Sequence, residues 1–150
     1  MVETAPHRFA VRVYYEDTDA AGIVYYANYL KFAERARTEW MRDLGLSHSA
    51  LAQSAGAAWA VRSCAIDYRR PARLDDALTV ETRLTALGGA SADLVQIVRR
   101  DDEDLARLTL RLAFIAPDGR PRRLPPSVRA LFAPLTQSKA QSKAQSKEGP

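Results

Sequence analysis

The chain has 150 residues, enough for one domain, and its 47% hydrophobic and 27% charged residues are ordinary for a globular protein. The net charge is only +4 and the arginines are scattered, which argues against a nucleic-acid-binding protein. No apolar run approaches the roughly 20 residues of a membrane span, and the N-terminus lacks a signal-peptide pattern, so a cytoplasmic protein without a membrane span is predicted. The single cysteine, Cys64, cannot form an internal disulfide, which agrees with that compartment.

A strand and then a long helix are predicted in the first third of the chain. Residues 9–13 alternate apolar with small or charged side chains, the period of a half-buried strand. Residues 24–44 contain neither proline nor glycine, and their apolar residues recur every three or four positions, which predicts an amphipathic helix. Gly45 is a natural stop for this helix, and Ser47 can cap a short second helix that ends near residue 54.

The rest of the chain is predicted to form strands joined by short turns. Apolar and polar residues alternate, wholly or in part, in segments 59–69, 78–84, 94–98 and 108–114. Strands at this spacing with short turns predict an antiparallel meander. One long helix before the strands would pack across the sheet, so the predicted fold class is α+β.

The C-terminus carries a repeat that sets the domain boundary. Gln-Ser-Lys-Ala occurs at residues 137–140 and again at residues 141–144, and Gln-Ser-Lys follows at residues 145–147. Since this segment has no large apolar residue, burial cannot offset the entropy lost on ordering it. The sequence therefore predicts one domain over residues 1–136 and a disordered tail over residues 137–150.

Several common types of catalytic site are missing from the sequence. The two histidines, His7 and His48, are not spaced as metal ligands, and no cluster of cysteine and histidine indicates zinc. Neither the serine elbow of many hydrolases nor a glycine-rich phosphate-binding loop occurs. Cys64 has no histidine near it in the sequence and is more typical of an inert thiol than of a nucleophile. An acidic loop is left as the main candidate for chemistry.

The acidic loop lies between the predicted strand and the long helix. Glu16, Asp17 and Asp19 lie within four positions, and Gly22 follows them just before the helix. The first N–H groups of a helix have no intrahelical partner and could polarise a substrate carbonyl. A carboxylate beside them could attack that carbonyl or deprotonate a water. Alternatively, the acids only cap the helix and form a turn, and spacing does not choose among the three.

The loop and the helix together resemble a known family. Residues 17–25, Asp-Thr-Asp-Ala-Ala-Gly-Ile-Val-Tyr, followed after two residues by Asn-Tyr, resemble the signature of the 4-hydroxybenzoyl-CoA thioesterase family. The wider run of residues 11–39 is more similar to the Tol-Pal-associated acyl-CoA thioesterases. Residues 71–76, Pro-Ala-Arg-Leu-Asp-Asp, resemble a second stretch of that group. The resemblance extends over about residues 8–133.

The resemblance implies a hotdog fold, in which an antiparallel sheet wraps around one long central helix. It implies an enzyme that hydrolyses an acyl-CoA thioester to the free acid and CoA, with neither metal nor organic cofactor. Asp19 corresponds to the family's catalytic aspartate, a nucleophile or a general base, and the Tyr26 backbone N–H corresponds to the group that polarises the carbonyl. Members form homodimers or homotetramers with active sites at subunit interfaces, and an acyl carrier protein is a further candidate partner.

Two departures from the family pattern bear on the acyl group and on the CoA phosphates. Position 26 is Tyr, as in the benzoyl-CoA enzymes, where many Tol-Pal-associated members have His. Short aliphatic and aromatic acyl groups therefore both remain candidates. The turn at residues 87–91 lacks the arginines that the benzoyl-CoA enzymes use for the CoA phosphates.

The candidate substrate-binding residues are Gly22, Tyr25, Arg62 and Arg73. The two arginines suit phosphate because of their fixed fork of donors, and a solvated surface charge is the alternative interpretation of each. The alternative function is an acyl-carrier-protein or acyl-CoA binding partner in envelope or phospholipid metabolism, without turnover. A purely structural domain is a third hypothesis, and the complete Asp-x-Asp-x-x-Gly motif argues against it.

Overall fold

A computed structural model of the protein describes residues 5–136. Its strands are β1 (His7–Arg12), β2 (Ala58–Tyr68), β3 (Ala77–Leu87), β4 (Ser91–Arg100) and β5 (Glu103–Ile115). Its helices are α1 (Asn28–Asp43), α2 (His48–Ala55) and α3 (Pro126–Phe132), and its 3-10 turns are η1 (Tyr15–Asp17) and η2 (Ala133–Thr136). Among the described residues, no helix is both long and apolar enough to cross a membrane. The predicted tail, residues 137–150, lies outside them.

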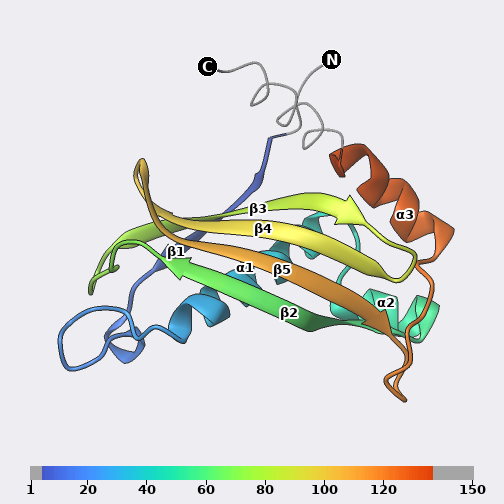
Figure 1. The fold of residues 1–150 in the computed structure, drawn as a ribbon, viewed down its shortest axis with the longest axis horizontal. Coiled ribbons are helices and arrows are strands. Elements are labelled where there is room, and N and C mark those ends of the chain that lie inside the picture. The colour runs from blue at the N-terminus through green and yellow to red at the C-terminus, as the bar shows by residue number, and fades with distance from the viewer. Residues whose placement is uncertain (1–4, 137–150) are drawn as a thin grey trace.

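The five strands form one antiparallel sheet in the order β1-β3-β4-β5-β2 (Figure 1). β3, β4 and β5 follow one another as the predicted meander. β2 precedes β3 in the chain but pairs with β5 at the far edge of the sheet, so the meander prediction is wrong for this strand. The reason is that residues 69–76 carry the chain back across the sheet, and β1 takes the place beside β3.

α1 lies across one face of the sheet, behind the strands in Figure 1. Its apolar side turns inward as the residue spacing predicts, and Ala33 and Ala36 are fully buried, which lets the helix approach the strands closely. Inward-facing residues of β3 and β4, among them Val80 and Val98, join these alanines in one core cluster. The predicted α+β hotdog arrangement, a sheet over one long helix, is confirmed.

A second core cluster includes residues of α3, a helix for which the sequence pattern gave no prediction. Pro126 is the first residue of this short helix, a position where proline's missing N–H costs nothing. Phe132 is fully buried and its ring stacks on Trp40 of α1, with the centroids 5.3 Å apart. Val128 is buried in the same cluster. α3 therefore packs against the C-terminal half of α1.

α1 begins four residues later than the sequence predicts. The Val24 N–H donates to the Ala72 carbonyl at 2.8 Å, and the Tyr25 N–H donates to the Asp17 carbonyl at 3.0 Å. These bonds tie the segment to two other parts of the chain in an extended conformation, which overrides its helical periodicity. Tyr26 therefore lies in the turn before α1 and not inside the helix.

The second core cluster gives a stability prediction. We expect Phe132→Ala to lower the free energy of unfolding by about 3–5 kcal/mol, because it removes a fully buried ring that stacks on Trp40. Leu131→Ala is the matched control in the same helix; its side chain is 41% exposed, so a loss below about 1 kcal/mol is expected. Urea unfolding measures both, and equal losses would contradict the assigned packing.

Candidate active site

Asp17 is the structural member of the three acids. It is only 8% exposed, and its Oδ2 accepts a hydrogen bond from the Tyr14 N–H at 2.8 Å. Its carbonyl oxygen accepts two more, from the Tyr25 N–H at 3.0 Å and from Asn28 Nδ2 at 2.8 Å. Asp17 thus joins the end of the first strand to the segment that enters α1.

Asp19 has an exposed carboxylate on a fixed backbone. Its N–H donates to the Ile23 carbonyl at 2.9 Å, and its carbonyl accepts from the Gly22 N–H at 3.0 Å. Its Oδ1 accepts from the Ala21 N–H at 2.9 Å, which orients the carboxylate. Glu16, the third acid, is exposed on η1. Of the three, Asp19 is the one that combines exposure with an oriented side chain.

Gly22 is needed for its backbone conformation. Its φ is +78°, in the left-handed region that residues with a Cβ rarely adopt. A Cβ at this position would meet no atom of this chain within 4 Å, so steric space does not require glycine. The tight return from Asp19 to Ile23 depends on this φ.

The turn that follows leaves the Tyr26 N–H without a hydrogen-bond acceptor among the described residues. The Tyr25 carbonyl accepts from the Asn28 N–H at 2.8 Å, which makes Tyr26 and Ala27 the central residues of a hydrogen-bonded turn. Within residues 5–136, no hydrogen bond uses the Tyr26 N–H. The bridge between Thr18 and Val24 draws this turn and the acidic loop together. An oriented carboxylate and a free N–H therefore occupy one short stretch of chain.

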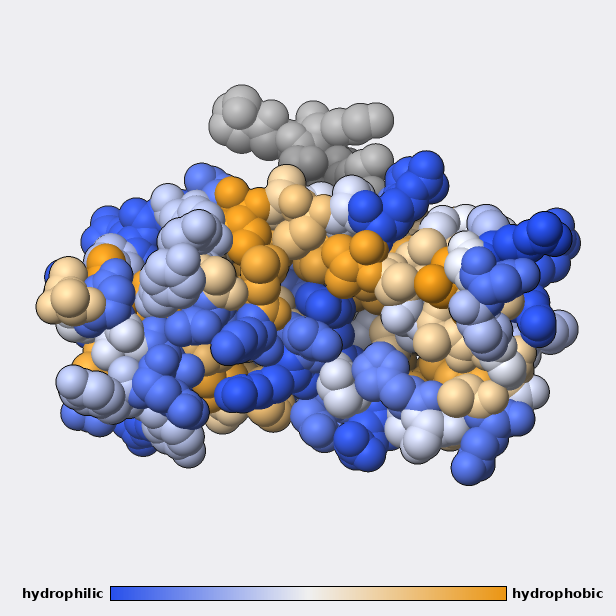
Figure 2. Space-filling model, turned by 90° about the horizontal axis from the view of Figure 1, so that it is seen from below, coloured by the Kyte–Doolittle hydropathy of each residue, from blue (hydrophilic) through white to orange (hydrophobic). Residues whose placement is uncertain are grey.

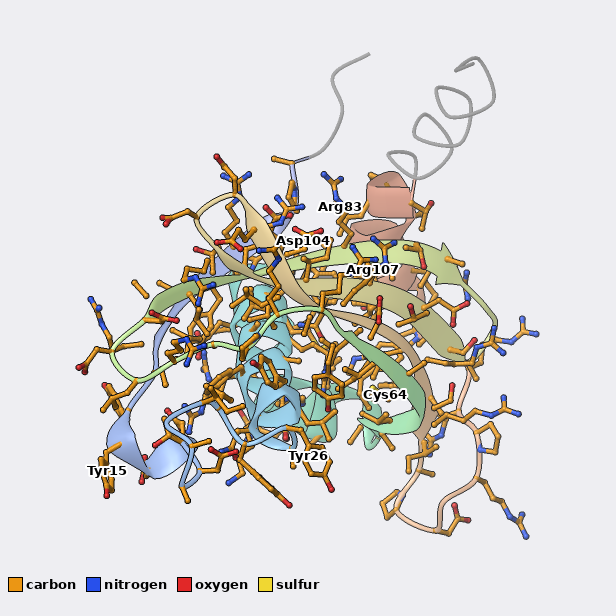
Figure 3. The ribbon with its side chains drawn as sticks, turned by 60° about the vertical axis from the view of Figure 1, so that its left-hand side comes forward. Tyr15, Tyr26, Cys64, Arg83, Asp104 and Arg107 are labelled. Atoms are coloured by element: carbon orange, nitrogen blue, oxygen red, sulfur yellow. The ribbon has the colours of Figure 1, made fainter. Side chains whose placement is uncertain are left out.

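A hollow of about 320 Å³ opens beside this turn. Its wall is largely aromatic and apolar, and its lining residues are Ile23, Val24, Tyr26, Tyr29, Tyr68, Arg69, Arg70 and Pro71. Burial raises the pKa of Tyr29 and the pKa of Tyr68, so both hydroxyls stay protonated at neutral pH. A larger hollow, about 660 Å³, lies on the sheet face opposite α1 and is lined in part by Arg83 and Arg107. Figure 3 shows these two arginines well away from Tyr26.

The fold brings one of the two candidate arginines to the loop. Arg73 forms a β-bridge with Ile23, and the Leu74 N–H donates to the Gly22 carbonyl at 3.4 Å. The Arg73 side chain is exposed, and its charge interacts with the Asp76 carboxylate. Arg62 lies at a bulge in the middle of β2, about 20 Å along the strand from its last residue, so it is not at the loop.

Two residues at the loop carry hydrogen bonds that the sequence pattern did not predict. Asn28 is buried and holds Asp17 through its side-chain amide. Asn28 is the first residue of α1, and its amide donates to Asp17 instead of capping the helix, so the usual capping signal does not predict this bond. The Tyr68 hydroxyl donates to the Tyr26 carbonyl at 2.9 Å. No local signal points to that bond, because the two residues are 42 positions apart in the chain.

Comparison with known proteins finds relatives over most of the chain. Residues 13–132 match the family model described as the thioesterase-like superfamily. The acyl-CoA thioesterase YbgC of Haemophilus influenzae is 42% identical over 125 residues, which cover 83% of this chain and 92% of that protein. A probable thioesterase from Bartonella henselae has 40% identity and a TM-score of 0.78, covering 81% of this chain and all of that one. A Thermus thermophilus thioesterase complexed with coenzyme A and Zn has 29% identity and a TM-score of 0.77, covering 91% and 98%.

The chain belongs to the thioesterase-like superfamily, since the family model spans most of its length. The prediction that it is a thioester-hydrolysing enzyme of this class is confirmed, because curated relatives above 40% identity over more than four fifths of the chain are thioesterases.

The different environments of the acids give a second stability prediction. Asp17→Ala should lower the free energy of unfolding by about 1–2 kcal/mol, because the Tyr14 N–H loses a charged acceptor. Asp19→Ala serves as the control and should change it by less than about 1 kcal/mol, since that carboxylate is exposed. Thermal and urea unfolding of both variants measure the difference. A larger loss for Asp19→Ala would refute the structural role given to Asp17.

Proposed function

We propose that the protein hydrolyses acyl-CoA thioesters to the free acid and CoA. The observation that carries this proposal is the exposed, oriented Asp19 carboxylate in the same short loop as the free Tyr26 N–H. The relatives named acyl-CoA thioesterases and the coenzyme A bound in the Thermus structure support acyl-CoA as the substrate class.

In the proposed mechanism, the Tyr26 N–H donates to the thioester carbonyl oxygen and stabilises the charge that develops there. Asp19 then acts by one of two routes. As a nucleophile, its oxygen adds to the carbonyl carbon, the C–S bond breaks, CoA leaves as a thiolate that takes up a proton, and water hydrolyses the mixed anhydride. As a general base, it takes a proton from a water whose oxygen adds to the carbonyl before the same C–S bond breaks.

The hollow beside Tyr26 supports a small acyl group. Its volume of about 320 Å³ is at the lower end of ligand pockets, which suits a short aliphatic chain or one aromatic ring. We propose that Gly22 and Tyr25, which flank the loop, contact the substrate as its thioester carbonyl enters the site. The exposed guanidinium of Arg73, beside Ile23, is the first candidate for the CoA phosphates.

We further propose that the subunits pair through β2 into a homodimer, and that dimers can pair into a homotetramer. β2 is an edge strand of 11 residues, and Val61 and Tyr68 on it are 49% and 46% exposed. β2 is the lowest strand in Figure 1, and Figure 2 shows the molecule from below that view. Hydrophobic patches lie among hydrophilic ones on this side. A long unpaired edge is a template for another strand. Two-fold antiparallel pairing would set Arg62 near the axis and one subunit's Tyr68 near its partner's Ala58.

An acyl carrier protein is proposed as a second carrier of the acyl group. Tyr14 and Tyr15 expose aromatic surface next to the loop, and aromatic residues are enriched where proteins bind one another. The resemblance of residues 11–39 to the Tol-Pal-associated group supports a role in the cytoplasm, in envelope or phospholipid metabolism. The alternative function, a binding partner without turnover, would use the same surface.

Replacing the proposed catalytic acid tests the enzyme assignment. Asp19→Asn should lower kcat/KM at least about 100-fold while the protein stays folded, because the amide neither attacks nor takes a proton. Glu16→Gln, the neighbouring exposed acid, is the control and should stay within twofold. Release of free CoA is measured across acyl-CoA chain lengths and with 4-hydroxybenzoyl-CoA. Unchanged turnover in Asp19→Asn refutes the mechanism, and negligible wild-type turnover with carrier binding retained supports the binding-partner alternative.

The phosphate assignment is tested with a substrate that lacks phosphates. Arg73→Ala should raise the KM for acyl-CoA about three- to tenfold, since one charge-assisted contact is lost. It should leave the KM for the matching acyl-pantetheine unchanged. Arg120→Ala, an exposed arginine in the loop before α3, is the control. An equal rise with both substrates would show that Arg73 shapes the loop instead of binding phosphate.

A further inference from the structure

Two hydrogen bonds hold the peptide groups on either side of the Tyr26 Cα. The peptide that contains the Tyr26 N–H is fixed through its carbonyl, which accepts from the Asn28 N–H at 2.8 Å. The following peptide is fixed through the Tyr26 carbonyl, which accepts from the Tyr68 hydroxyl at 2.9 Å. The direction of the Tyr26 N–H depends on both, because rotation about the backbone bonds of this residue moves one peptide relative to the other.

Tyr68 is well placed to hold this turn from outside. It is the last residue of β2, so its backbone belongs to the sheet and not to the loop. Its ring packs edge-on against Tyr29, with centroids 5.5 Å apart, and against Tyr26, with centroids 6.3 Å apart. Its hydroxyl is a donor at all physiological pH values, since burial raises the pKa of Tyr68. A sheet residue therefore presents a fixed donor to the turn.

The backbone conformation of Ala27 is a second restraint on that side of the turn. Ala27 has φ −72° and ψ −19°, and a flip of the Tyr26–Ala27 peptide would require a positive φ at Ala27, which its Cβ disfavours. Smaller rotations of the same peptide are not opposed by Ala27. The Tyr26 N–H belongs to the preceding peptide, so a rotation of this peptide in place leaves it unchanged, whereas a displacement of the Tyr26 Cα moves it. The Tyr68 bond to the Tyr26 carbonyl restrains that displacement, and an N–H stabilises an oxyanion only when it is aimed at the oxygen.

We propose that Tyr68 is a positioning residue for thioester hydrolysis: its hydroxyl holds the Tyr26 carbonyl and thereby keeps the Tyr26 N–H aimed at the substrate carbonyl. This inference rests on the proposed function, which assigns the carbonyl-polarising role to that N–H. Tyr68 is not given a catalytic role, because its hydroxyl is engaged by the Tyr26 carbonyl.

Tyr68→Phe isolates the hydroxyl, since the ring that lines the hollow and the β2 edge is retained. We expect kcat to fall about tenfold, equivalent to ~1.4 kcal/mol of transition-state stabilisation, with KM within twofold. The Tm should change by less than about 3 °C, because the bond lies at a half-exposed side chain. A merely structural role would lower Tm and would not single out kcat.

Thr85→Val is the matched control. The Thr85 hydroxyl also donates to a backbone carbonyl, that of Asp93 at 3.1 Å, on the sheet face away from α1. The Thr85→Val variant loses the same type of hydrogen bond at a site away from the loop. Its kcat should therefore stay within twofold of the wild type. Both variants are assayed with the acyl-CoA that gives the highest wild-type turnover.

Three outcomes overturn the proposal and one supports it. A tenfold loss of kcat in Tyr68→Phe alone, with KM and Tm preserved, supports the positioning role. Wild-type kcat in Tyr68→Phe, or an equal loss in Thr85→Val, overturns it while leaving the proposed function intact. Absence of wild-type turnover on every acyl-CoA overturns the proposed function and the Tyr68 role with it.

Discussion

The carbonyl oxygen of Asp17 is the acceptor on which the site depends. It binds the Tyr25 N–H and the Asn28 side chain, while the Asp17 carboxylate binds the Tyr14 N–H. One buried residue thus connects the end of the first strand, the turn and the first residue of α1. Because these bonds come from outside the helix, the Tyr26 N–H is positioned by tertiary contacts instead of by the helical ladder. The carboxylate of Asp19, two positions after Asp17, is then available for chemistry.

The crossing segment, residues 69–76, supports the loop from the other side. Its buried Ala72 accepts the Val24 N–H, and Arg73 bridges to Ile23. Asp75 and Asp76 continue this contact, since each shares a backbone hydrogen bond with Val13 at the end of the first strand. This segment exists because β2 lies at the far edge of the sheet and the chain must return to β3. The unexpected strand order and the shape of the site therefore have the same origin.

The sequence predicted the features that depend on local pattern. The alternation of the strands, the apolar face of α1 and the acidic loop were all visible, and the family resemblance singled out Asp19. What pattern did not reveal depends on contacts between distant residues: the start of α1, fixed by Asp17 and Ala72, the place of β2, and the Tyr68 bond to Tyr26. Likewise, the two arginines looked equivalent in sequence, but topology sets Arg73 beside the loop and Arg62 at mid-strand.

The edge position of β2 links the open side of the sheet to the turn before α1. Among the described strands β2 pairs only with β5, so its backbone is less restrained than that of a central strand. Its last residue, Tyr68, nevertheless holds the Tyr26 carbonyl. Any chain that pairs with the free edge would restrict the strand that carries this hydroxyl. If the proposed assembly through β2 occurs, it would be coupled to the proposed aim of the Tyr26 N–H through a single strand, because the edge that is open to a partner belongs to the element that holds the turn.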